Sequence, residues 1–316
     1  MTKARIDVHH HVLPDFYKDV QRAAGITGTA YQAFPQWSPE SSLEVMDAHG
    51  IATAILSFTS PGIFFGDVAQ TRGLAVRFND YLAGLVAERP TRFGGFAMLP
   101  LPDVDASLRE IARIYDELKL DGICLLTSVD ERYIGHRDFE PVYAELDRRR
   151  AVTFIHPCYP PGTEAQGWDI PRMIIDYPFE TTRVATNLIL NGVTTRYPNI
   201  RFILSHAGGT LPMLTHRIAI FDKMPRFRES CPDGALAHVA RFYYDTALSG
   251  HHAPLDALTA FVPPSQILFG TDYPYVVPAV VTAETAGFDA YKGFGAARGN
   301  VERGNAERLF PRLALS

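Results

Sequence analysis

Short apolar runs alternate along the whole chain with longer segments of helical periodicity. The runs are continuously hydrophobic rather than alternating, which is typical of parallel strands buried on both faces. Strands are predicted over 4–9, 51–57, 93–98, 121–126, 151–156, 200–205, 242–246 and 266–270. Helices are predicted over 40–49, 68–88, 104–118, 138–149, 179–196, 210–222, 254–261 and 278–290, with a last helix over 296–310.

This alternation predicts a single α/β domain, residues 1–316, folded as a (β/α)8 TIM barrel. An open doubly wound sheet is the alternative. It is disfavoured because no Gly-x-Gly-x-x-Gly turn follows a strand: Gly94-Gly95 lies inside one, and Gly208-Gly209 lacks the rest of the motif. The segment near 12–38 is expected to be a long loop insertion, of the kind that forms lids or substrate walls.

Composition narrows the class of protein. The 316 residues are 47% hydrophobic and 21% charged, the profile of a soluble globular chain. The net charge is -5, from 30 basic and 35 acidic residues with no long basic run, so nucleic acid is not an expected partner. No apolar stretch reaches the roughly 20 residues of a membrane span.

The expected location is the cytoplasm. No apolar signal-peptide region follows Met1. The three cysteines, Cys124, Cys158 and Cys231, are odd in number and far apart, which argues against a disulfide framework.

The rare chemical residues gather at strand ends. His9 and His11 close the first predicted strand, His156 the fifth and His206 the sixth, while Asp272 follows the eighth. In a barrel these positions share one rim, where active sites form. Alternate side chains of a strand share a face, so His9 and His11 can bind one cation while His10 points away.

Nitrogen and carboxylate ligands suit Zn²⁺, Mn²⁺ or Fe²⁺, and an open coordination position marks a catalytic site. Each residue alone also has an ordinary structural explanation: His156 ends a strand before Pro157, His206 caps a helix, and Asp272 lies in a turn. The common placement of all of them at strand ends favours the metal site.

At these residues the sequence resembles the amidohydrolase superfamily. Within it the chain is similar to the branch of aminocarboxymuconate-semialdehyde decarboxylase and the salicylate-type decarboxylases, with 6-methylsalicylate decarboxylases nearest. The matching stretches are 6–11, 154–157, 177–182, 203–209 and 268–274.

The resemblance implies that His9, His11, His156 and Asp272 bind one divalent metal ion. Zinc is the first expectation and manganese the second. It also implies that His206 is an acid–base group. Many hydrolytic relatives carry a metal-bridging lysine at the fourth strand, whereas this strand ends Cys124-Leu125-Leu126-Thr127, so a mononuclear site is expected.

Arg217 lies eleven residues after His206. In the semialdehyde decarboxylases an arginine at this spacing reaches the neighbouring subunit's site, which implies a homodimer and a substrate-binding role for Arg217. A solvated helix arginine is the alternative. A second family arginine, expected shortly after Trp37-Ser38-Pro39-Glu40, is missing. A monocarboxylate substrate is therefore favoured over a dicarboxylate.

The resulting hypothesis is a non-oxidative decarboxylase of a small hydroxylated aromatic monocarboxylic acid, 6-methylsalicylate-like, with Asp272 or His206 delivering a proton to the ring. Loop aromatics are candidates for a wall around the ring: Phe58, Phe64, Phe65, Tyr159, Trp168 and Phe179. One alternative is a metal-dependent hydrolase such as a lactonase, in which the metal activates water. Another is a metal-binding scaffold without catalysis.

Overall fold

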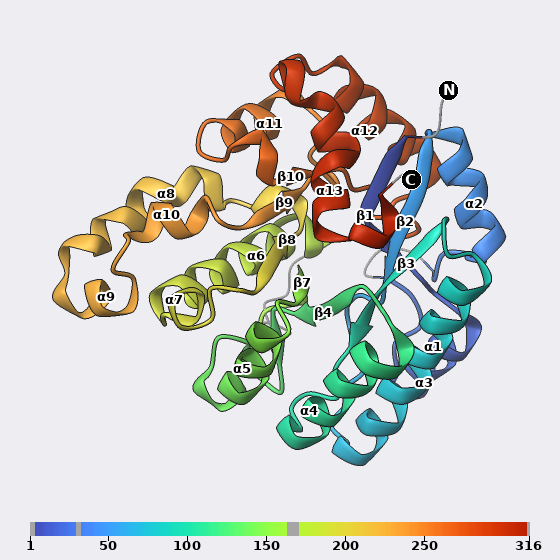
Figure 1. Ribbon diagram of the computed structural model, residues 1–316. Coiled ribbons are helices and arrows are strands. Elements are labelled where there is room, and N and C mark those ends of the chain that lie inside the picture. Colours follow the sequence, from blue (N-terminus) through green and yellow to red (C-terminus); the bar gives the residue numbers. More distant parts are fainter. Residues whose placement is uncertain (1–3, 30–32, 163–170, 315–316) are drawn as a thin grey trace.

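A computed structural model of the protein describes residues 4–29, 33–162 and 171–314, and within them a ring of parallel strands surrounded by helices (Figure 1). The sheet has eight strands in the order β1-β2-β3-β4-β7-β8-β9-β10. Their bounds are β1 Arg5–His11, β2 Ile51–Ser57, β3 Phe93–Met98, β4 Gly122–Leu126, β7 Val152–His156, β8 Arg201–Leu204, β9 Tyr243–Asp245 and β10 Ile267–Leu268. All eight coincide with predicted strands.

The first and last strands meet and close the barrel. The Val8 amide donates to the Phe269 carbonyl at 2.9 Å, and the His11 amide donates to Tyr273 at 2.7 Å. The Asp7 carboxylate adds a side-chain link, because it accepts from the Thr271 amide at 3.1 Å and from its hydroxyl at 2.6 Å. The predicted (β/α)8 barrel is therefore confirmed.

Helices pack around the outside, and their starts follow local capping rules. Ser38 and Ser41 form a reciprocal capping box at the start of α2, with Pro39 in the first turn. The main helices are α2 Pro39–Ala48, α3 Val68–Glu88, α4 Val104–Arg113, α5 Glu140–Arg148, α6 Met173–Leu190, α8 Leu211–Ala219, α11 His252–Thr259, α12 Pro278–Ala290 and α13 Asn305–Leu309. Asp67 and Asp103 cap α3 and α4 with side-chain oxygens that accept from the amides of Gln70 and Ala106.

The structure adds short elements that were not predicted. The segment 12–38 contains the helix α1 (Asp15–Ala23). A hairpin of β5 (Ser128–Val129) and β6 (Arg132–Tyr133) follows β4. The predicted helix 179–196 is divided into α6 and α7 (Val193–Arg196). Each addition lies in a connection beyond a barrel strand.

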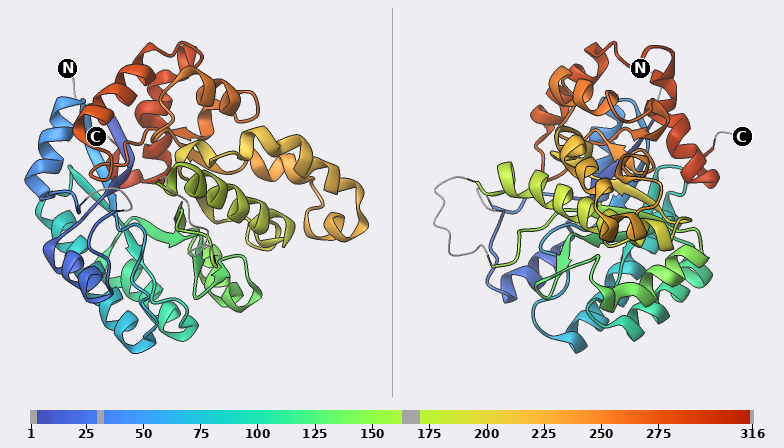
Figure 2. Two further views of the ribbon diagram at one scale, coloured as in Figure 1. Left: turned by 180° about the vertical axis from the view of Figure 1, so that it is seen from behind. Right: turned by 90° about the vertical axis from the view of Figure 1, so that its left-hand side faces the viewer.

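Helices α8, α9 (Pro225–Ser230) and α10 (Ala235–Val239) form an arm that projects away from the barrel (Figures 1 and 2). Its surface exposes large apolar side chains, namely Met213, Ile220, Phe221, Met224 and Leu236. Single exposed apolar residues are ordinary, but several together on one projecting element indicate a contact surface.

Within the described ranges, none of the helices combines the length and the apolar character needed to cross a bilayer.

Candidate metal centre

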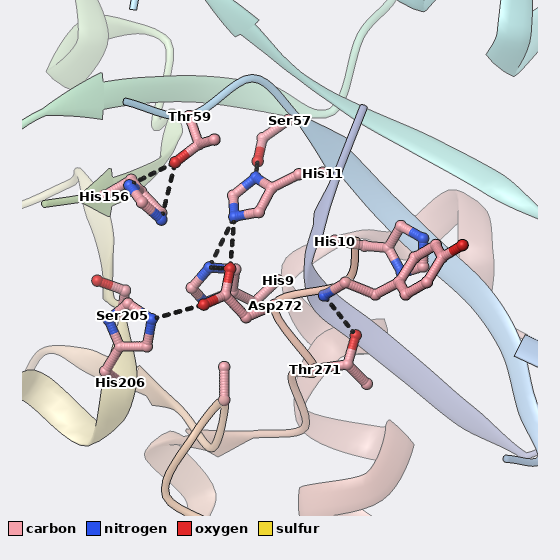
Figure 3. Close-up of polar contacts among 12 residues, drawn as sticks. His9, His10, His11, Ser57, Thr59, His156, Ser205, His206, Thr271 and Asp272 are labelled. Atoms are coloured by element: carbon pink, nitrogen blue, oxygen red, sulfur yellow. Dashed lines mark hydrogen bonds and ion pairs between the residues drawn. The ribbon is translucent and has the colours of Figure 1, made fainter. Parts of the chain in front are cut away.

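His9 and His11 leave the carboxyl end of β1 on one side of the strand (Figure 3). Their Nε2 atoms lie 3.0 Å apart. His10 points to the opposite side, where its Nδ1 lies 3.0 Å from Asp7 and its Nε2 lies 3.0 Å from Ser42. The two-residue period of the strand therefore separates two converging histidines from one structural histidine, as predicted.

Asp272 follows the last barrel strand, β10, and contacts both histidines. Its Oδ1 lies 3.3 Å from Nε2 of His9 and 3.0 Å from Nε2 of His11. Asp272 has a φ of +63°, in the left-handed region that few non-glycine residues adopt. Its amide donates to the carbonyl of His9 at 2.8 Å. This turn aims the carboxylate back over the end of β1.

His156, at the end of β7, completes the cluster. Ligand atoms of His9, His11, His156 and Asp272 all lie within 4.8 Å of one another, and all four residues are buried. Four ligands bonded roughly 2.1 Å from a tetrahedral zinc ion lie roughly 3.4 Å apart. The contacts of Asp272 with the β1 histidines match that spacing, so the four side chains fit a single divalent ion.

The remaining ring nitrogens have partners that orient each imidazole. Nδ1 of His11 lies 2.9 Å from the Ser57 hydroxyl. Nδ1 of His156 donates to the carbonyl of Pro157 at 2.8 Å, which leaves Nε2 of His156 as the metal-binding nitrogen. The Thr59 hydroxyl lies 2.9 Å from Nδ1 and 3.1 Å from Nε2 of the same ring. Such partners fix the tautomer of metal-binding histidines.

Asp245, the last residue of β9, orients His9. Its Oδ2 lies 2.8 Å from Nδ1 of His9, and neither side chain has any exposed surface. Its Oδ1 accepts from the amides of His206 at 2.9 Å and Ala247 at 3.0 Å. One buried carboxylate therefore positions both a metal ligand and the backbone of the candidate acid–base residue.

His206 stands on the outer side of Asp272. Its Nε2 lies 3.2 Å from Oδ2 of Asp272, so the carboxylate faces the metal ligands with one oxygen and His206 with the other (Figure 3). The φ of His206 is +53°, and that of the following Ala207 is +54°. Backbone strain of this kind is found where a side chain is held for function. Among the described residues, the buried Nδ1 of His206 has no hydrogen-bond partner.

The pKa shifts leave three of the four ligands in the protonation state that binds a cation. Burial lowers the pKa of His11 to about 4 and holds that of His156 well below its usual value, so both rings are neutral. Burial opposes ionisation of Asp272, but the surrounding histidines outweigh it and hold its pKa well below the usual range. For His9, burial is outweighed by Asp245 and Asp272, which raise its pKa to about 10. A metal must therefore displace one proton from His9.

Comparison with known proteins gives the family of this site. The sequence model of the amidohydrolase family matches residues 6–312. The chain belongs to the amidohydrolase family. This amidohydrolase is 37% identical over 316 residues to the 6-methylsalicylic acid decarboxylase of Penicillium expansum, with 98% of this chain and 97% of the relative covered. It is 37% identical over 326 residues to the decarboxylase macB of Penicillium terrestre, with 98% and 96% covered.

A solved structure agrees with the fold. The 2,6-dihydroxybenzoate decarboxylase from Rhizobium superposes on the amidohydrolase with a TM-score of 0.82 at 26% sequence identity. The superposition covers 98% of this chain and 99% of the other. Both comparisons extend over essentially the whole barrel.

The amidohydrolase structure does not bring every predicted site residue to the metal cluster. Arg217 is exposed on α8, in the projecting arm, and within the described chain it forms no ion pair with the cluster. Among the loop aromatics, Phe64 and Tyr159 line a cavity over the carboxyl ends of β3 and β4. Phe58 is instead fully buried in the core, and Phe179 is 44% exposed. Trp168 lies outside the described residues.

Sequence reasoning missed the residues that orient the ligands: Ser57, Thr59 and Asp245. A partial signal was present for Asp245, a charged residue inside an otherwise apolar and aromatic strand. Ser57 and Thr59 lie at the end of β2 with no comparable signal, because their roles depend on which strands are neighbours in the barrel.

Proposed function

We propose that this amidohydrolase is a metal-dependent non-oxidative decarboxylase of a small hydroxylated aromatic monocarboxylic acid, of the 6-methylsalicylate kind. The observation that carries the proposal is the double contact of Asp272, with the metal-binding histidines on one oxygen and His206 on the other. This arrangement supports a role for His206 as a proton carrier next to the metal ligands. The named activity of the relatives that share 37% identity supports the same reaction class.

The reaction requires a proton on the ring before carbon dioxide leaves. Direct loss of carbon dioxide would place an unstable electron pair in the plane of the ring. A divalent ion held by His9, His11, His156 and Asp272 would supply positive charge that attracts the oxygens of the substrate and so fixes the orientation of the ring. Electron density from the phenolate then accepts a proton at the carbon that bears the carboxylate. The carbon–carbon bond breaks, and its electron pair restores the aromatic ring.

His206 is the better candidate for the proton donor. Asp272 is held ionised by the histidines around it, so its own proton is not available at neutral pH. Nε2 of His206 lies 3.2 Å from Oδ2 of Asp272 and is the neighbouring acid–base group of this carboxylate. Asp272 therefore acts as metal ligand and as the group that orients His206 toward the ring.

The site is proposed to hold one ion per chain. The four ligands form one cluster, and the fourth strand ends Cys124-Leu125-Leu126-Thr127, without a bridging lysine. Burial raises the pKa of the Cys124 thiol far above neutrality, so it is not a thiolate ligand. Three nitrogens and one oxygen suit zinc and also manganese. Elemental analysis of purified protein decides between them, and two ions per chain would contradict the mononuclear site.

We further propose a homodimer assembled through the arm of α8–α10. Its exposed apolar side chains supply the contact surface, with Met213 the most exposed at 73%. Arg217 lies on the same helix and would grip the substrate carboxylate in the partner's site. Sedimentation of the wild type should give twice the chain mass, and Met213→Asp should shift the protein toward monomer.

We place the protein in the cytoplasm. Cys124, Cys158 and Cys231 are all free and buried, in keeping with a reducing compartment. Fractionation of the source cells tests this location.

Isotopes test the reaction class. Turnover of 6-methylsalicylate in deuterium oxide should place one deuterium on the ring carbon that carried the carboxylate. In water labelled with heavy oxygen the aromatic product should gain no label. A hydrolase such as a lactonase gives the reverse pattern, with heavy oxygen in the product acid and no carbon dioxide. That result would overturn the decarboxylase proposal.

A variant tests the role of His206. His206→Asn removes the titratable ring without replacing any of the four ligands, so metal content should stay at one ion per chain while kcat falls by about 100-fold or more. Retained activity in a metal-loaded His206→Asn protein would assign the proton to another group.

A further inference from the structure

A cavity of about 310 Å³ opens beside the metal cluster at the carboxyl ends of β3 and β4. It adjoins the site through neighbours of the ligand His156. Leu126, which lines the cavity, pairs with His156 in the sheet, and Cys158 lies two residues after it. Ser60, another lining residue, follows Thr59, whose hydroxyl contacts the His156 ring. These links place the cavity next to His156, on the β4 side of the metal cluster.

The lining of the cavity is mostly apolar, although it also includes the polar side chains of Ser60, Ser128 and Cys158. Its wall includes the aliphatic side chains of Ile63, Met98, Leu101, Leu125, Leu126 and Ile134. Of the described residues that line it, none carries a positive charge, and the exposed carboxylates of Asp130 and Glu131 lie at its rim. Asp130 is paired with Arg132 at 2.7 Å, but Glu131 leaves the rim negative. A second carboxylate on the substrate would be repelled there.

The cavity lies across the barrel from the turn that carries Asp272. In the closed ring of eight strands, β4 is four strands away from β10, so the two strands face each other across the barrel. Asp272 follows β10 and His206 follows β8, whereas the cavity lies over β3 and β4. An aromatic acid held by its carboxylate end at the metal would extend away from Asp272, and the cavity lies on the side of the barrel opposite Asp272.

The volume exceeds what one small ring requires. An apolar protein cavity of about 150 Å³ accommodates a benzene molecule. The 310 Å³ here is about twice that volume, so a ring bearing a single methyl group would leave a large part of it empty. The side chains around such an empty apolar space lack van der Waals contacts that a larger ligand would provide.

We propose that the substrate carries an extended apolar substituent, an alkyl chain of several carbons, which this cavity binds. This inference rests on the proposed function and specifies its substrate class as alkylated hydroxybenzoates without a second charge. The cavity sets the preference for chain length, while the metal and His206 carry out the reaction at the common carboxylate end.

Binding of reaction products tests the cavity without requiring turnover. Decarboxylation of a 6-alkylsalicylate gives a 3-alkylphenol, so the probes are 3-methyl-, 3-propyl- and 3-pentylphenol, titrated by calorimetry into metal-loaded protein. Each buried methylene should lower Kd by about fourfold until the cavity is full. Affinity that is flat or falls with chain length would overturn the proposal. If no salicylate released carbon dioxide but the affinity series still rose, the reaction would be wrong and the cavity assignment would stand.

A filled cavity supplies the second test. Val129 lines the cavity from β5 and is only partly buried, so the hairpin tolerates Val129→Trp. The added ring should abolish the preference for pentyl over methyl, measured as the ratio of the two Kd values and of kcat/KM for the matching 6-alkylsalicylates. Val280→Trp is the matched control, because Val280 is 39% exposed on α12, away from the cavity. An unchanged ratio in Val129→Trp would show that the chain binds elsewhere.

Discussion

Replacing Asp245 by asparagine should weaken metal binding by about 10- to 100-fold, although Asp245 is not itself a ligand. Both of its carboxylate oxygens accept from N–H groups, one from His9 and the other from the amides of His206 and Ala247. An amide side chain has only one accepting oxygen. Whichever way the substituted side chain is oriented, therefore, at least one buried donor faces an NH2 group, at a cost of about 1–3 kcal/mol.

The loss of charge acts in the same direction. The carboxylate of Asp245 attracts both the metal ion and the proton that competes for His9. Because the ion carries twice the charge of the proton, neutralising Asp245 weakens metal binding more than it weakens binding of the competing proton to His9. A loss of about 10- to 100-fold corresponds to about 1.4–2.7 kcal/mol of binding free energy.

The assay is equilibrium competition with a chelator of known affinity, followed by metal analysis of the protein. Asp121→Asn is the matched control, because the Asp121 side chain is 4% exposed and pairs with Arg312 far from the ligands. The control should lower the free energy of unfolding while its metal affinity stays within about twofold of the wild type. Wild-type affinity in Asp245→Asn, or equal metal loss in both variants, would refute the reasoning.

Three further predictions concern the ligands and the arm. His11→Ala should lose both the metal and activity, whereas His10→Ala should keep the metal. His10→Ala should still lower the free energy of unfolding by about 2–4 kcal/mol, because it breaks two buried hydrogen bonds. Metal analysis and denaturant unfolding measure both effects, and equal metal loss in the two variants would contradict the assignment of His10 to the opposite side of the strand. Between pH 6.5 and about 10, metal uptake should release about one proton per chain, because His9 in the metal-free protein is protonated below its raised pKa. Calorimetry in buffers of different ionisation enthalpy measures the number of protons released. Proton release that does not decline above pH 10 would assign the proton to another group. Mixing Arg217→Ala chains with Asp272→Ala chains should restore part of the activity, and no recovery in a confirmed mixed dimer would remove the cross-subunit role of Arg217.

The strands and the metal ligands could be predicted from the sequence because each leaves a local signal. A strand buried on both faces is continuously apolar, and the ligands stand immediately at the ends of such runs, as His156 does after Phe154-Ile155. The alternation of side chains along the strand also predicted that His10 points away from the metal, unlike His9 and His11. These inferences need only the period of the strand and the polarity of the barrel rim.

The parts that could not be predicted depend on contacts distant in sequence. Helix α1 was missed because Lys18 and Gln21 are buried although polar, which hides its apolar face. Helices α9 and α10 are too short to show a helical period. The pairing of Asp245 with His9 joins positions 236 residues apart, so it became visible only with the strand order known.

The position of the metal at the seam of the barrel has a consequence for biosynthesis. His9 belongs to β1, whereas Asp272 follows β10, so the ligand set is incomplete until the last barrel strand has been synthesised. A nascent chain that ends before β10 has an unpaired edge at β1 and lacks the carboxylate that joins the ion to His206. Since an ion held by both ends favours the closed barrel by mass action, metal loading should stabilise this seam once the chain is complete. Full-length protein short of the metal should therefore be cleaved by proteases at the seam more readily than the loaded protein.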